Sequence, residues 1–173
     1  MDAIVRYKDT DGKPAFIAIE TKYTDVLGEN TSGRKTAKYD EWIERIGMFK
    51  PDTEAELIRS AKAAKTAKDA KELKQILKGM KVVTQIYRNF LLTECYGIKE
   101  GANRCYSVVL APAQHPTTEH EVASLKDDLK PEDQYKISAL SLEDFIERTF
   151  KVCPEGDKAP FLYFKERYRP YPL

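Results

Sequence analysis

Apolar residues gather in two short segments near the start of the chain and recur with helical spacing farther along. The two segments, residues 2–7 and 16–23, predict β-strands. Asp11-Gly12 lies between them, and this dipeptide tolerates the positive φ values of a tight turn. We therefore expect a hairpin that returns residue 2 toward the far end of the second strand.

Helical periodicity is clear in three later segments, residues 38–49, 82–96 and 141–150. The segment 60–81 is rich in Ala and Lys and is expected to be helical by propensity. Its lysines are compatible either with a solvated, partly projecting helix pair or with a basic arm that grips phosphates. Asp52, just upstream, is interpreted as a helix N-cap.

A nearly continuous apolar run at 105–112 predicts a buried central strand, reached by a crossover and hence parallel to a neighbour. Residues 135–140 alternate and predict a further strand. A polar helix or lid is expected at 117–130, and a short helix within the aromatic and basic tail at 160–171. This order of elements is typical of an α/β fold in which helices lie on the faces of a mixed sheet.

The composition limits the classes of protein to which this chain can belong, but it does not indicate a function. The 173 residues fit one domain, and the formal net charge of +1 leaves nucleic-acid contact to local patches. Three cysteines without paired spacing favour a reduced compartment over a disulfide framework. No apolar run reaches the roughly 20 residues that cross a bilayer, and no signal peptide is evident. We expect a cytoplasmic protein without a membrane partner.

The second strand ends with two charged residues, Glu20 and Lys22. Because side chains alternate along a strand, both project from the same face. Burying a carboxylate and an ammonium at the end of a strand costs free energy unless the two groups are paired or have a functional role. The alternative is an edge strand whose outer face carries a solvated Glu and Lys. The predicted hairpin brings Asp2 toward this pair.

An Asp, a hairpin, and an apolar strand that carries Glu-x-Lys together resemble the PD-(D/E)xK superfamily of restriction-endonuclease-like nucleases. The resemblance covers roughly residues 2–150 and implies a restriction-endonuclease-like mixed β-sheet flanked by helices. We therefore expect a single domain over 1–173, with a helical Ala/Lys-rich insertion at about 50–80. Family members usually carry a helix before the Asp strand, and we expect that helix to be absent because Asp2 directly follows Met1.

The resemblance implies catalytic roles for Asp2, Glu20 and Lys22. Asp2 and Glu20 correspond to the metal ligands, and Lys22 to the lysine that orients or activates the attacking water. Hard oxygen ligands suit Mg²⁺ or Mn²⁺. Asp25, in the polar loop that follows, is either an auxiliary acid or the start of a turn.

The helix predicted at 82–96 carries Gln85, Arg88 and Asn89, which can share one neighbourhood at these spacings. In the superfamily, a helix after the Glu-x-Lys strand often presents a Gln or a basic residue to the site. This implies that Gln85 is catalytic and that Arg88 binds a substrate phosphate. Alternatively, Arg88 pairs with an acid such as Glu94.

The resulting hypothesis is a metal-dependent nuclease that hydrolyses phosphodiester bonds in DNA, with a homodimer left open. One alternative is a catalytically inactive nuclease-fold protein that binds nucleic acid or a protein. Another is a small domain that only assembles into a larger complex. Metal binding that depends on Glu20 separates the first hypothesis from the others.

Overall fold

The computed structural model describes residues 2–22, 38–78, 80–81 and 83–167. Asp25, for which two roles were considered, lies outside these residues. Within them, four strands form one sheet in the order β1-β2-β3-β4. β1 (Ala3–Lys8) and β2 (Pro14–Thr21) are antiparallel, whereas β3 (Arg104–Ala111) and β4 (Ile137–Ser141) each run parallel to the preceding strand. The sheet is therefore mixed, as expected.

The hairpin between β1 and β2 closes with local hydrogen bonds. Gly12 has a φ of 74°, and its N–H donates to the Asp9 carbonyl oxygen. The Asp9 carboxylate accepts the N–H groups of Asp11 and Lys13 and the side-chain amide of Asn103. The turn thus relies on a glycine in the left-handed region and on an Asp that satisfies turn amides.

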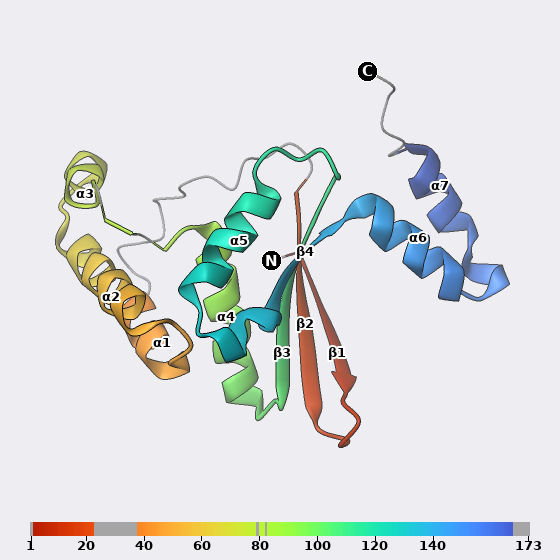
Figure 1. Cartoon of the computed structure of the whole chain (residues 1–173), viewed down its shortest axis with the longest axis horizontal. Helices are drawn as coiled ribbons and strands as arrows, with labels where there is room; N and C mark the ends of the chain where they lie inside the picture. The colour runs from red at the N-terminus through yellow and green to blue at the C-terminus, as the bar shows by residue number, and fades with distance from the viewer. Residues whose placement is uncertain (1, 23–37, 79, 82, 168–173) are drawn as a thin grey trace.

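Helices lie on both sides of the sheet (Figure 1). Two of them, α4 and α5, cover one face, and α1, α2 and α3 lie beyond α4, while α6 and α7 project on the opposite side. Their bounds are α1 (Tyr39–Ile46), α2 (Pro51–Thr66), α3 (Ala70–Ile76), α4 (Gln85–Glu100), α5 (Thr118–Asp128), α6 (Leu142–Val152) and α7 (Ala159–Arg167). Short 3-10 helices occupy Pro131–Lys136 and Glu155–Asp157.

The main core lies between the sheet and the helices of the α4 side. Its fully enclosed side chains include Ile43, Phe49, Phe90 and Leu125. Phe90 lies on the face of α4 that meets the sheet, where it packs edge-on against Phe49 with ring centroids 6.3 Å apart. This packing fixes the rotation of α4 about its axis and so determines which α4 residues reach the end of β2.

Three element boundaries differ from the sequence expectation. Lys50 is the N-cap of α2, and Asp52 lies in the first turn, because Pro51 occupies the first helical turn, where its missing N–H costs nothing. α4 begins at Gln85 rather than at residue 82. β4 begins at Ile137 because residues 131–136 form a 3-10 helix after Pro131.

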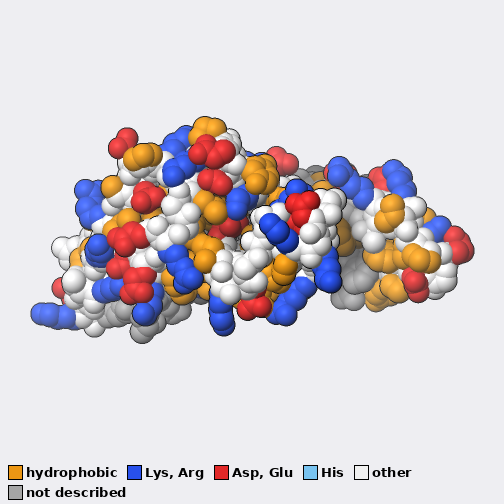
Figure 2. Space-filling model, turned by 90° about the horizontal axis from the view of Figure 1, so that it is seen from below, with side chains coloured by type: hydrophobic (Ala, Val, Ile, Leu, Met, Phe, Trp, Pro, Cys, Tyr) orange, Lys and Arg blue, Asp and Glu red, His pale blue; other side chains and the backbone are white. Residues whose placement is uncertain are grey.

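The surface carries both signs of charge. On the face seen in Figure 2, Lys and Arg side chains alternate with Asp and Glu side chains over the helices. All three cysteines are free thiols. None of the helices in the described ranges has the length and apolarity needed to cross a bilayer.

Candidate active site

The register of the hairpin places the start of β1 beside the end of β2. Ala3 pairs with Ile19, and the Asp2 N–H donates to the Ile19 carbonyl oxygen at 2.9 Å. The chain continues past β2 along β3, because the Lys22 N–H donates to the Leu110 carbonyl oxygen at 2.7 Å. Asp2, Glu20 and Lys22 therefore lie at one end of the sheet, where the parallel strands β2 and β3 also end.

Glu20 and Lys22 form a buried ion pair. Lys22 Nζ lies 2.9 Å from Glu20 Oε1, and the two residues are only 6% and 7% exposed. The alternative of a solvated pair on an outer face does not hold. Removing either charge alone would leave the other in a poorly hydrated position.

The first residue of α4 completes this arrangement. Gln85 Nε2 donates to Glu20 Oε1 at 2.7 Å, so an amide and an ammonium share one carboxylate oxygen. The next residue, Ile86, and Phe90 are buried toward the sheet. The helical spacing that directs these apolar residues inward also directs Gln85 toward Glu20.

Asp2 makes a different set of contacts. Its Oδ2 accepts hydrogen bonds from the N–H and the hydroxyl of Thr21, both at 2.7 Å. These bonds lower the pKa of the Asp2 carboxyl, and the positive charge of Lys22 adds to the effect. The structure thus brings Asp2 to the same end of the sheet as Glu20 but directs its carboxylate toward Thr21.

Arg88 follows Gln85 by one turn of α4 and is half-buried. Its guanidinium forms no hydrogen bond or ion pair with another described residue. Glu94, the alternative partner considered above, instead pairs with Lys136 at 2.9 Å. The Arg88 guanidinium is therefore not paired with Glu94.

A further carboxylate lies near the site on α5. Burial raises the pKa of the Glu121 carboxyl, and the charge of Lys22 is among the influences that oppose this rise. Glu121 is thus close enough to Lys22 to interact with it electrostatically. Glu121 was not among the site residues expected from the sequence, where residues 117–130 indicate only a polar helix or lid. No signal within that segment indicates its distance from β2.

The donor chemistry of the site fits a hard divalent cation. Asp2 and Glu20 offer carboxylate oxygens, and Mg²⁺ typically binds one or two protein carboxylates, keeps several waters and takes substrate phosphate as a ligand. Among the described residues, no group of three or more His, Cys, Asp or Glu side chains is arranged to hold a metal. The site therefore matches a divalent cation in the chemical type of its donor atoms, because two carboxylates lie at one end of the sheet.

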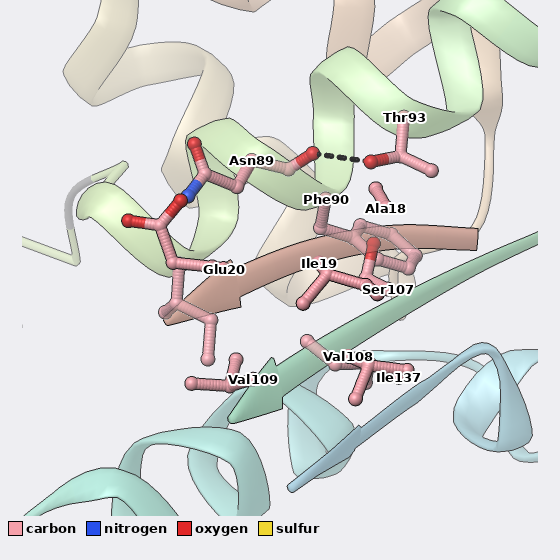
Figure 3. Close-up of a pocket in the computed structure, with 11 residues that line it drawn as sticks. Ala18, Ile19, Glu20, Asn89, Phe90, Thr93, Ser107, Val108, Val109 and Ile137 are labelled. Carbon is pink, nitrogen blue, oxygen red and sulfur yellow. Dashed lines mark hydrogen bonds between the residues drawn. The ribbon is translucent and has the colours of Figure 1, made fainter. Parts of the chain in front are cut away.

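A small cavity of ≈ 20 Å³ lies behind Glu20, between α4 and the sheet. Figure 3 shows Glu20 and Asn89 at one end of it and Thr93 and Ser107 farther along. Its other walls are apolar and come from β2, β3, β4 and α4, namely Ala18, Ile19, Ile86, Phe90, Val108, Val109 and Ile137. The carboxylate thus stands at the boundary between the core and the exposed end of the sheet.

The mixed sheet, its flanking helices and the Glu-x-Lys strand are those expected of a restriction-endonuclease-like protein. A family model described as PD-(D/E)XK nuclease superfamily matches residues 1–170. The chain belongs to this superfamily, and its restriction-endonuclease-like α/β fold is confirmed. Comparisons with curated proteins and with solved structures gave no match. Membership indicates a nuclease-type function, and nucleases of this superfamily generally use divalent metals.

Proposed function

We propose that the protein is a Mg²⁺- or Mn²⁺-dependent nuclease that hydrolyses phosphodiester bonds in DNA. The observation that carries the proposal is the buried group of Glu20, Lys22 and Gln85, held by hydrogen bonds at the end of β2. A buried carboxylate and ammonium are seldom retained without a partner or a use. Membership of the nuclease superfamily supports catalysis as the use of this buried pair.

Each residue of the site has a distinct task in this proposal. Asp2 and Glu20 would hold the metal ion, which when bound neutralises phosphate charge and supplies a hydroxide-like nucleophile. Gln85 orients the Glu20 carboxylate through its 2.7 Å hydrogen bond. Lys22 turns from Glu20 to the attacking water or to the phosphate.

Arg88 is the proposed phosphate contact. It lies one turn along α4 from Gln85, so it is on the helix that already reaches the site. A guanidinium can hold a phosphate with two parallel hydrogen bonds. Its side chain has no ion-pair partner among the described residues, which leaves the charge available for a substrate.

The direct test is incubation of the purified protein with linear, circular and single-stranded DNA, and with RNA, in the presence of Mn²⁺. Cleavage of circular DNA would show endonuclease action, and cleavage of RNA alone would contradict the DNA assignment. A lack of any cleavage, together with a lack of Glu20-dependent Mn²⁺ binding, would contradict the proposed function.

We expect Lys22→Ala to lower the single-turnover cleavage rate at saturating Mn²⁺ by about 10²–10⁴-fold, the usual loss for a positioned proton-transfer group. Mn²⁺ binding should be largely retained, because both carboxylates remain. Lys22→Arg should restore only part of the rate, since a guanidinium has a different reach. A matched control is Lys151→Ala, which removes an exposed lysine paired with Glu147 on α6. An unchanged rate in Lys22→Ala would remove this residue from the mechanism.

A catalytically inactive nuclease-fold protein that binds nucleic acid or a protein is the second candidate. The orientation of the Asp2 carboxylate toward Thr21, away from a common metal cluster, favours it. So does the ion pair that already engages Glu20. DNA binding without Mn²⁺ binding and without cleavage would support this candidate over the first.

We also propose that the protein is cytoplasmic and that it forms a homodimer. Three free cysteines suit a reducing compartment. β1 is at the edge of the sheet and exposes apolar side chains, which supports self-association. Fractionation of cells that produce the tagged protein tests the first point.

A further inference from the structure

α4 presents two side-chain amides toward the end of β2. Gln85 and Asn89 are four residues apart, so they lie one above the other on the same face of the helix. Gln85 already donates to Glu20 Oε1. Asn89 follows on the side nearer the core and lines the cavity behind Glu20.

The side-chain nitrogen of Asn89 is buried and has no hydrogen-bond partner among the residues that the structure describes. The residue is 9% exposed. Figure 3 shows the Asn89 side chain pointing toward the Glu20 carboxylate rather than into the apolar part of the cavity. Buried amide groups are nearly always hydrogen-bonded, so an unused donor directed at a carboxylate calls for an explanation.

The surroundings keep Asn89 in this position. The backbone carbonyl oxygen of Asn89 accepts a hydrogen bond from Thr93 Oγ1 at 2.8 Å, within α4. The neighbouring Phe90 is fully enclosed in the core. Because α4 cannot rotate without moving Phe90 out of the core, Asn89 stays on the wall of the cavity behind Glu20.

We propose that Asn89 is a positioning residue for Glu20, and the inference rests on the proposed nuclease function. In this structure Lys22 and Gln85 share Glu20 Oε1. When Lys22 turns from Glu20 toward substrate, the carboxylate loses one of its donors. Asn89 Nδ2 is the donor in place to replace it, so Gln85 and Asn89 together hold the Glu20 carboxylate in the orientation that binds the metal ion.

The first test is a Mn²⁺ titration of the full chain, followed by electron paramagnetic resonance. Asn89→Leu keeps the approximate size of the side chain and removes the donor, and we expect Mn²⁺ to bind about 10–100-fold more weakly, as for other groups that orient a metal ligand. The matched control is Gln75→Leu, which removes an exposed side-chain amide on α3 and should bind as the wild type does. Wild-type affinity in Asn89→Leu would overturn the inference.

Glu20→Ala in the same titration separates this inference from the function on which it rests. If Glu20→Ala weakens binding and Asn89→Leu does not, only the positioning role of Asn89 is lost. If the wild type shows no Mn²⁺ binding that depends on Glu20, the proposed function and the positioning role both fail.

A second measurement uses the wild-type protein and does not depend on the variant folding. The side-chain amide resonances of ¹⁵N-labelled protein are followed during a Mg²⁺ titration. We expect the Asn89 and Gln85 amide signals to shift together, whereas the Asn103 amide, which donates to Asp9 at the opposite end of the hairpin, should not move. A shift of Gln85 without a shift of Asn89 would overturn the inference.

Discussion

Glu20 and Lys22 stabilise each other only as a pair. Taking two charges out of water carries a large desolvation cost, which their attraction and the Gln85 hydrogen bond offset. Breaking such a buried pair by removing one partner costs roughly 3–5 kcal/mol. A rate lost in Lys22→Ala therefore has to be measured on protein shown to be folded. Glu20→Gln keeps the size of the side chain but leaves the Lys22 charge unpaired, so its folding has to be checked in the same way.

The hydrogen bonds of Asp2 lead to a prediction about how the stability of the fold depends on pH. Its hydrogen bonds from Thr21 lower the pKa of the Asp2 carboxyl below the ordinary value of an aspartate. An acid whose pKa is depressed by folding adds stability above its unfolded pKa, and this contribution is lost as the pH falls through the folded pKa. Thr21→Val removes the hydroxyl donor and should raise the pKa of Asp2. It should also lower the free energy of unfolding at pH 6 by under about 1 kcal/mol, because solvent screens this exposed group.

The destabilisation by Thr21→Val should fade below about pH 4 and vanish once Asp2 is protonated in both states. Carboxyl ¹³C NMR reports the pKa, and urea unfolding at pH 6 and at acid pH reports the stability. Thr21→Ser retains the hydroxyl and serves as the control. An Asp2 pKa equal in wild type and Thr21→Val would show that this hydroxyl does not hold the carboxylate.

At the scale of elements, α4 approaches the sheet through a glycine. A Cβ atom built on Gly97 would lie 2.0 Å from Cys105 Sγ, whereas Cys105 Cβ is 3.5 Å away. We expect Gly97→Ala to destabilise the fold by about 1–3 kcal/mol through overpacking, despite the higher helix propensity of Ala. Chemical denaturation measures this change.

The second variant Cys105→Ala makes the test specific. It removes the sulfur atom that the new methyl group meets, so the double variant should recover much of the stability lost in Gly97→Ala. Cys105→Ala alone gives the cost of the missing sulfur. Simple additivity of the two single changes would show that the contact with Cys105 is not the cause.

Periodicity was sufficient to predict most elements of this fold. The parallel pairing of β3 followed from its continuous apolar run, and α6 from the helical spacing of residues 141–150. The helix begins just after Ser141, whose Oγ accepts the Asp144 N–H. The N-terminus of α2 was missed because the local preference of Pro51 for the first helical turn outweighed the capping preference of Asp52. Local side-chain chemistry decides such boundaries more than hydrophobic pattern does.

The site was only partly readable from the sequence. The proximity of Glu20 and Lys22 follows from strand alternation, and the reach of Gln85 from helical spacing. By contrast, the orientation of Asp2 toward Thr21 depends on a rotamer, which no pattern encodes. The approach of Glu121 to Lys22 depends on how α5 packs against the sheet, which is a tertiary property.

At the scale of the whole molecule, the site occupies one end of the sheet, and β1 is an edge strand of the sheet that the described residues form. The carboxyl ends of β2, β3 and β4 meet where Glu20 and Lys22 lie, the usual place for ligands on sheets with parallel strands. β1 lies at the opposite margin of the sheet from β4. Self-association through β1 would therefore extend the sheet sideways rather than cover its carboxyl end.

The edge position of β1 gives the last prediction. All six of its residues are exposed, and Val5 is 45% exposed. The Arg6 guanidinium lies over the rings of Phe16 and Tyr96. Its charge therefore does not point outward from the edge, where it would oppose the pairing of another strand. Two copies of β1 can pair in antiparallel fashion around a twofold axis and continue one sheet through both copies.

We therefore expect sedimentation analysis to show a monomer–dimer equilibrium, and Val5→Lys to shift it toward the monomer, because a charge on an edge strand opposes pairing. Val152→Lys is the control, since Val152 on α6 is even more exposed, at 82%, but is not on the sheet edge. A wild-type protein that remains monomeric at high concentration would contradict the homodimer. Equal dissociation by Val5→Lys and Val152→Lys would instead contradict the assignment of β1 as the interface, because only one of these residues lies on that edge.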